Sequence, residues 1–115
     1  MARPRLKGAT DQSVTLYVVD DSDGTPETIT HATSGLALWY RREGGAKTTI
    51  TPVALASLTT AHTDGGVEAI GDGATRVDIP DAAFASGAGE VTIGGTATDM
   101  VIVPTTIALV DYNNQ

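Results

Sequence analysis

Two aspartates flank a proline late in the chain and could form an acid–base pair. Asp78 and Asp81 lie three positions apart across Pro80. A catalytic pair would need one carboxyl with a raised pKa and a cleft that both groups line. The surrounding pattern gives a simpler prediction, in which a strand ends at Pro80 and carries Arg76 and Asp78 outward into water. Asp81 then lies near the start of a short helical turn, so we expect both carboxylates to have structural roles.

Metal and nucleophile chemistry is also weakly indicated. Residues 20–24 resemble part of a calcium loop, but the alignment puts Val19 and Thr30 at two ligand positions, where neither can serve. An acidic surface turn is the prediction, and an irregular calcium site stays open. His31 and His62 have no neighbouring His, and the chain has no Cys and no G-x-S-x-G motif. We therefore predict no catalytic, cofactor-binding or metal-binding residues, and no enzymatic activity.

The charge balance separates a basic start from an acidic remainder. The chain has 7 Lys and Arg against 14 Asp and Glu, a net charge of −7. Arg3, Arg5 and Lys7 supply three of these cations, so residues 8–115 hold four cations against fourteen anions, or −10. Such a body repels a phosphate backbone, and nucleic acid is not an expected partner. We expect residues 1–10 to be a flexible arm that becomes ordered on a neighbouring acidic surface.

The chain shows no signal for secretion or membrane insertion. Its first eight residues lack an apolar stretch, and no apolar run approaches the ~20 residues of a membrane helix. We expect a protein that is made in the cytoplasm and has no membrane partner.

Composition and periodicity favour an all-β chain. Thirteen Gly and many Thr weigh against helices. Alternation such as that of Val14, Leu16 and Val18 predicts strands with one buried face. A helical turn over residues 81–86 should fold Phe84 onto the core. The predicted strands are residues 13–20, 35–43, 47–51, 66–70, 75–79, 90–94 and 100–110. About seven strands joined by turns predict one immunoglobulin-like β-sandwich domain over residues 11–115.

Two stretches allow more than one structure. Residues 52–58 read as weakly helical or irregular, because a proline precedes several apolar residues. Residues 100–110 are apolar on both faces and contain Pro104, which cannot donate a ladder hydrogen bond. This last segment is an edge strand, a bulged strand, or two strands that switch sheets.

One aromatic residue is a candidate contact residue. Trp39, the only tryptophan, faces away from Leu38 and lies close to Arg41 and Arg42. It either packs as a structural side chain or lies exposed as an anchor for a sugar or a protein. The candidate protein-contact residues are therefore Trp39, Arg41 and Arg42, together with Arg3, Arg5 and Lys7 of the arm.

Several stretches, taken in order, resemble a known family. They are residues 14–24, 35–44, 62–66, 70–85 and 103–111, and the most specific run is G-D-G-A-T-R-V-D-I-P-D-A-A-F. Over nearly the whole chain after residue 10 they resemble small β-sandwich domains encoded in the structural gene clusters of tailed phages. The N-terminal domain of baseplate upper proteins is similar. The resemblance implies a virion component without enzymatic activity, made as a soluble subunit and assembled onto a particle.

The resemblance leaves the position in the particle open. We expect an adaptor of the tail, baseplate or neck that contacts other virion proteins in a symmetric oligomer. A head decoration protein is the alternative within this class. A free-standing module that binds carbohydrate or a host surface through Trp39 is the alternative of a different class.

Overall fold

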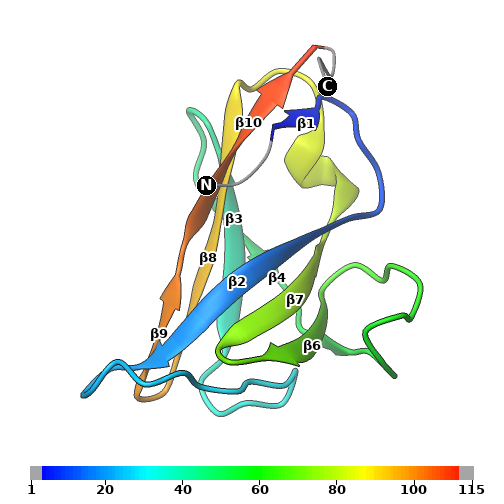
Figure 1. Cartoon of the computed structure of the whole chain (residues 1–115). Helices are drawn as coiled ribbons and strands as arrows, with labels where there is room; N and C mark the ends of the chain where they lie inside the picture. Colours follow the sequence, from blue (N-terminus) through cyan, green and yellow to red (C-terminus); the bar gives the residue numbers. More distant parts are fainter. Residues whose placement is uncertain (1–3, 112–115) are drawn as a thin grey trace.

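The computed structural model describes residues 4–111, and its regular structure is almost entirely β (Figure 1). The all-β prediction is confirmed. No helix in the described part is long and apolar enough to cross a membrane. The described strands are β1 (Arg5–Leu6), β2 (Gln12–Asp20), β3 (Ala37–Arg42), β4 (Lys47–Ile50), β5 (Val53–Ala54), β6 (Gly66–Gly71), β7 (Ala74–Ile79), β8 (Glu90–Ala97), β9 (Met100–Val103) and β10 (Thr105–Val110), and the 3-10 turn η1 (Asp81–Phe84) lies between β7 and β8.

The strands form one mixed sheet that folds over on itself. The hydrogen-bonded order is β1-β10-β8-β9-β2-β7-β6-β5, and β3 and β4 extend from the other side of β8. In Figure 1, β2, β7 and β6 lie in front of β3, β4 and β8. Neighbouring strands are antiparallel, except that β1 pairs in parallel with β10, and β5 with β6. The sheet therefore has an inner side that encloses the core and an outer side on each layer.

Pro104 divides the last predicted strand in two. Before it, β9 pairs along its length with β2; after it, β10 pairs with β8. Proline has no N–H to give to a ladder, so the pairing breaks at this point and the chain changes its main partner. Of the three structures left open for residues 100–110, the closest is the pair of strands, but β9 and β10 belong to one sheet and do not switch between two.

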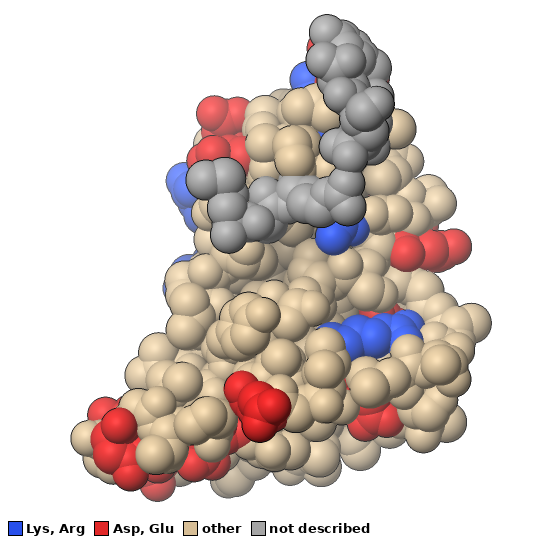
Figure 2. Space-filling model, viewed as in Figure 1, with Lys and Arg blue, Asp and Glu red and all other residues tan. Residues whose placement is uncertain are grey.

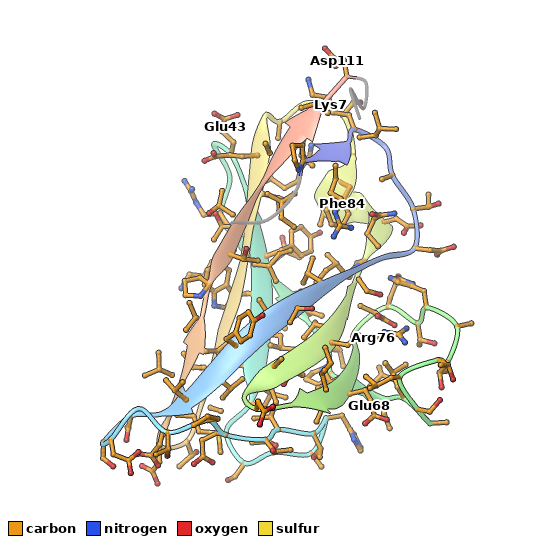
Figure 3. All side chains as sticks on the ribbon, viewed as in Figure 1. Lys7, Glu43, Glu68, Arg76, Phe84 and Asp111 are labelled. Atoms are coloured by element: carbon orange, nitrogen blue, oxygen red, sulfur yellow. The ribbon has the colours of Figure 1, made fainter. Side chains whose placement is uncertain are left out.

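The core consists of inward-facing aliphatic side chains and one phenylalanine. Val14, Leu16 and Val18 of β2 are buried, as their alternation predicted. Phe84 is also fully buried, and η1 directs it inward (Figure 3). Pro80 precedes this turn and interrupts the β7 ladder. The helical turn predicted for residues 81–86 is thus present as η1 and ends before Ala85.

The predicted hairpins are present, and one uncertain segment is settled. β3 pairs with β4, and β6 pairs with β7 across a turn in which Asp72 and Gly73 both have positive φ. Residues 52–58 are irregular apart from Val53–Ala54, which pairs with β6. The irregular reading of this segment is right and the helical one is wrong, because its backbone groups bond to a neighbouring strand.

Residues 4–10 differ from the flexible arm that composition predicted. Arg5–Leu6 pairs with β10, and the N–H of Lys7 donates to the carbonyl of Val110 at 2.8 Å. The N–H of Gly8 donates to the carbonyl of Phe84 at 2.6 Å. Local charge predicted disorder here, but the exposed edge of a distant strand supplies the partners that order the segment.

The two described cations of the arm also have partners within the chain. The Arg5 guanidinium donates to the side chain of Gln12 and, at 3.1 Å, to the carbonyl of Ser13. Lys7 Nζ lies 3.1 Å from Asp111 Oδ1 (Figure 3). Residues 1–3, and with them Arg3, lie outside the described residues.

Candidate functional site

Arg76 and Asp78 form a salt bridge on the outer face of β7. Nε of Arg76 donates to Oδ1 of Asp78, and Nη2 donates to Oδ2, each at 2.8 Å. Ser13, directly opposite on β2, donates its hydroxyl to Oδ1 at 2.6 Å, and the N–H of Thr63 donates to Oδ2 at 3.0 Å. The Asp78 side chain is fully buried. The prediction that Asp78 is hydrated is therefore wrong.

The cause is the loop of residues 55–65, which crosses this outer face. Nη1 of Arg76 donates to the carbonyl of Leu58 at 2.7 Å. Nε2 of His62 lies 3.1 Å from the carbonyl oxygen of Gln12, which anchors the loop to the start of β2. A Cβ at Gly66 would come within 2.9 Å of Asp78 Oδ2, so glycine leaves the room that the carboxylate occupies. Strand alternation predicts the side to which a residue points, but not what covers that side.

The surroundings of Asp78 keep it ionised. Burial is the largest influence and opposes ionisation, but the hydrogen bonds from Arg76, Ser13 and Thr63 together outweigh it. The pKa of Asp78 therefore lies below its ordinary value. The hydrogen bond to Asp78 in turn raises the pKa of Arg76. Asp81 is exposed and accepts a hydrogen bond from the N–H of Asp11 at 2.8 Å. The two aspartates thus have different partners and different environments.

The same outer face carries a row of exposed apolar residues. Val103 of β9 pairs with Tyr17 of β2, and Tyr17 pairs with Ala74 of β7. Ile70 lies at the bulge of β6, next along the face. The exposed fractions are 46% for Val103, 56% for Tyr17 and 50% for Ile70. Ala74, between Tyr17 and Ile70, is half-buried. We call Val103, Tyr17, Ala74 and Ile70 the apolar row. Contiguous exposed apolar residues commonly mark a surface where another molecule docks.

An open hollow of about 390 Å³ adjoins the apolar row. The anchored loop supplies Leu58 to its wall, and β7 supplies Arg76, which lies beside Glu68 of β6 (Figure 3). Leu58 is itself 44% exposed. The buried ion pair therefore helps to shape this surface, since it holds the loop that forms one wall. The full lining is Ser13, Val14, Thr15, Leu58, Ile70 and Arg76.

Three turns bring carboxylates to the end of the sheet that lies along one side of the apolar row. The N–H of Asp21 donates to the carbonyl of Asp99 at 3.1 Å, and the N–H of Val18 donates to the carbonyl of Gly73 at 2.8 Å. The first bond joins the turns of residues 20–27 and 97–100, and the second joins the turn of residues 71–73 to β2. None of the three turns contains Lys or Arg. In Figure 2 a group of acidic side chains lies at this lower end, next to a largely uncharged surface, and smaller groups lie at the upper left and at the right. We call Asp20, Asp21, Asp23, Glu27, Asp72 and Asp99 the acidic end.

The acidic turn predicted for residues 20–24 is present. Asp20 accepts hydrogen bonds from the side chain and the N–H of Ser22, at 2.6 and 2.7 Å, and these bonds lower the pKa of Asp20. Within residues 4–111, no three His, Cys, Asp or Glu side chains are grouped so as to hold a metal ion.

Trp39 lies on the outer face of the other layer. Its indole packs against Gly94, where a Cβ would come within 2.7 Å of the ring atom Cζ2. Nζ of Lys47 lies over the ring, 4.8 Å from its centroid. This packing favours the structural interpretation of Trp39 over a platform for a sugar ring.

The two arginines next to Trp39 diverge. Nε of Arg41 donates to the carbonyl of Gly45 at 2.9 Å within the β3–β4 turn. The Arg42 guanidinium donates instead to the carbonyls of Ala85 and, at 2.9 Å, Ser86, after η1. The structure therefore does not gather the predicted contact residues at one place. Trp39 and Arg41 share one face of β3, Arg42 lies on the other, and Arg5 and Lys7 bond near β1.

The apolar row was missed by reading the sequence, although part of its signal was visible. Tyr17 occupies an outward position in a clearly alternating strand, and residues 100–110 are apolar on both faces. Either observation alone is ordinary. Only the pairing of β9 with β2 puts Val103 beside Tyr17.

No protein-family model matches this chain, and no curated protein or solved structure matches it at a significant level. The proposals below therefore rest on the residues, on their geometry and on the resemblance described above.

Proposed function

We propose that this protein is a non-enzymatic structural subunit of a tailed-phage particle, an adaptor of the tail, baseplate or neck that assembles through protein–protein contacts. The observation that carries the proposal is the apolar row with its adjoining hollow. Tyr17, Val103 and Ile70 are each about half exposed on one sheet face. An adaptor needs such a surface in order to bind a neighbouring subunit, since apolar area removed from water drives association.

We propose further that the fold is an immunoglobulin-like sandwich. Three features support this assignment: the two layers around one core, the parallel pairing of the first strand with the last, and the short turn that carries Phe84 into the core. Domains of this architecture serve widely as binding modules, so the fold is compatible with the proposed role.

Quantitative mass spectrometry of purified particles tests the proposal. The particles are those of a phage whose genome encodes this chain, and the copies are counted against the major capsid protein. A few to a few dozen copies are expected for an adaptor of the tail, baseplate or neck. Hundreds of copies would instead assign the chain to head decoration or to the tail tube. Absence from infectious particles would refute the virion role.

A further inference from the structure

We infer that the apolar row and the acidic end form one docking surface, and that its partner is a protein with an apolar patch edged by Lys and Arg. This inference rests on the proposed function, because it names the chemistry of the neighbour that an adaptor would bind. The partner is a different protein and not a second copy of this chain.

The two parts of the surface are close enough to act together. Asp20 follows Tyr17 by three residues on β2, and Asp72 precedes Ala74 by two. At about 3.4 Å per residue, Asp20 lies roughly 10 Å from Tyr17 along β2, and Asp72, in the turn that leads into β7, lies at most about 7 Å from Ala74. The Debye length in physiological salt is about 8 Å, so the carboxylates act on charges that border the row on the side of the acidic end. A single partner can therefore cover the row and also face the acidic end.

The charge of this region indicates the partner. Arg76 lies next to the hollow, but its charge is paired with Asp78, and it also donates a hydrogen bond to the carbonyl of Leu58. A second copy docked on the row would bring another acidic end, and two chains that each carry −7 repel one another. A partner whose apolar patch is edged by Lys and Arg is instead attracted to the acidic end. Burial of the apolar row then drives association, and the acidic end orients the partner and speeds its association.

Two synthetic peptides test this chemistry on the purified protein. One alternates Leu with Lys, so that an extended strand has an apolar face and basic edges; the other alternates Leu with Glu. Fluorescence anisotropy should show binding of the Leu–Lys peptide at about 20 mM salt, with Kd at least about tenfold weaker at about 300 mM. The Leu–Glu peptide should not bind.

Surface variants locate the binding. The double substitution Tyr17→Ser with Val103→Ser should weaken Kd about tenfold, while Leu6→Ser, also exposed but on β1, should leave it unchanged. The substitution Asp21→Asn with Asp72→Asn should flatten the salt dependence, and asparagine still tolerates the positive φ of position 72. Glu90→Gln is the matched control, and urea unfolding confirms that each variant is folded.

Two results would overturn the inference. One is equal binding of the Leu–Glu peptide, or binding that the substitutions in the row leave unchanged. The other is a dimer in sedimentation equilibrium that dissociates when Tyr17 and Val103 are replaced, because the face would then belong to a second copy.

Carboxyl-to-amine cross-linking of purified particles separates this inference from the proposed function. The expected cross-links join Asp21, Asp72 or Asp99 to lysines of a different protein. Cross-links from these residues only to another copy of the chain would refute the inference and leave the virion role intact. If particles lack the chain, the virion role fails, and the peptide measurements still decide the docking chemistry.

Discussion

The guanidinium of Arg76 donates two 2.8 Å hydrogen bonds to the carboxylate of Asp78, and the two residues lie on the same strand. They are two positions apart on β7, so both point to its outer face. Ser13 and the N–H of Thr63 complete the carboxylate's partners. One buried anion thus connects β7, β2 and the loop of residues 55–65, and that loop forms a wall of the proposed docking surface.

Removing this anion should destabilise the protein strongly. Asp78→Ala leaves the Arg76 charge, whose side chain is only 14% exposed, without its partner. The expected loss in the free energy of unfolding is about 3 kcal/mol, at the low end for a broken buried pair. Urea unfolding measures it, with Glu90→Gln as an exposed control that should change stability by less than about 0.5 kcal/mol. A loss below about 1 kcal/mol for Asp78→Ala would contradict the assigned role.

The lowered pKa of Asp78 predicts a particular dependence of stability on pH. The unfolded carboxyl titrates near pH 3.9 and the folded one at a lower pH, so the unfolded state binds more protons in this window. The stabilisation is fully present above about pH 5 and is lost as the pH falls through the folded pKa. Stability measured from pH 6 down to pH 2 should therefore fall more steeply for the wild type than for Asp78→Asn. Parallel curves would argue against the shift.

Replacing the hydroxyl of Thr75 by a methyl group should stabilise the protein. Thr75 is fully buried, and its Oγ1 has no hydrogen-bond partner among the described residues. An unsatisfied buried hydroxyl costs about 1–3 kcal/mol, so Thr75→Val should raise the free energy of unfolding by about 1 kcal/mol. Thr49→Val, on the exposed part of β4, is the matched control and should have little effect. A destabilised Thr75→Val variant would mean that the hydroxyl has a partner after all.

The packing of Trp39 on Gly94 should be sensitive to a single methyl group. In Gly94→Ala the new Cβ would lie 2.7 Å from the indole and 3.2 Å from Pro104, so the ring must move. Overpacking of this kind costs about 1–3 kcal/mol. The emission of Trp39, the only tryptophan, should shift at the same time. Gly45→Ala has an ordinary nearest contact of 3.4 Å, so unchanged emission is expected there.

The first strand should contribute to stability in the isolated protein. Deleting residues 1–7 removes the pairing of Arg5–Leu6 with β10 and should lower the free energy of unfolding by about 2 kcal/mol. Lys7→Ala alone removes only a pair with Asp111, which is 80% exposed, and should have little effect. An unchanged urea midpoint for the deletion would restore the interpretation of these residues as a flexible arm.

Local pattern was enough to predict most strands, because a strand with one buried face alternates apolar and polar residues along the sequence. Val14, Leu16 and Val18 show it, and all three are buried. The Asp72–Gly73 turn and the stop at Pro80 were equally local, since they depend on backbone preferences of single residues. The sequence by itself therefore determined an all-β chain with its hairpins, its short turn and much of its core.

The environment of each outer face was decided only by the tertiary structure. Asp78 is buried because a loop from residues 55–65 crosses it, and Tyr17 lies in an apolar row because β9, more than eighty residues later, pairs beside it. Arg5 is ordered because the edge of β10 is available to pair with β1. In each case the deciding partner is distant in sequence. Side-chain alternation does not indicate which strand pairs with a given strand, or which loop covers its outer face.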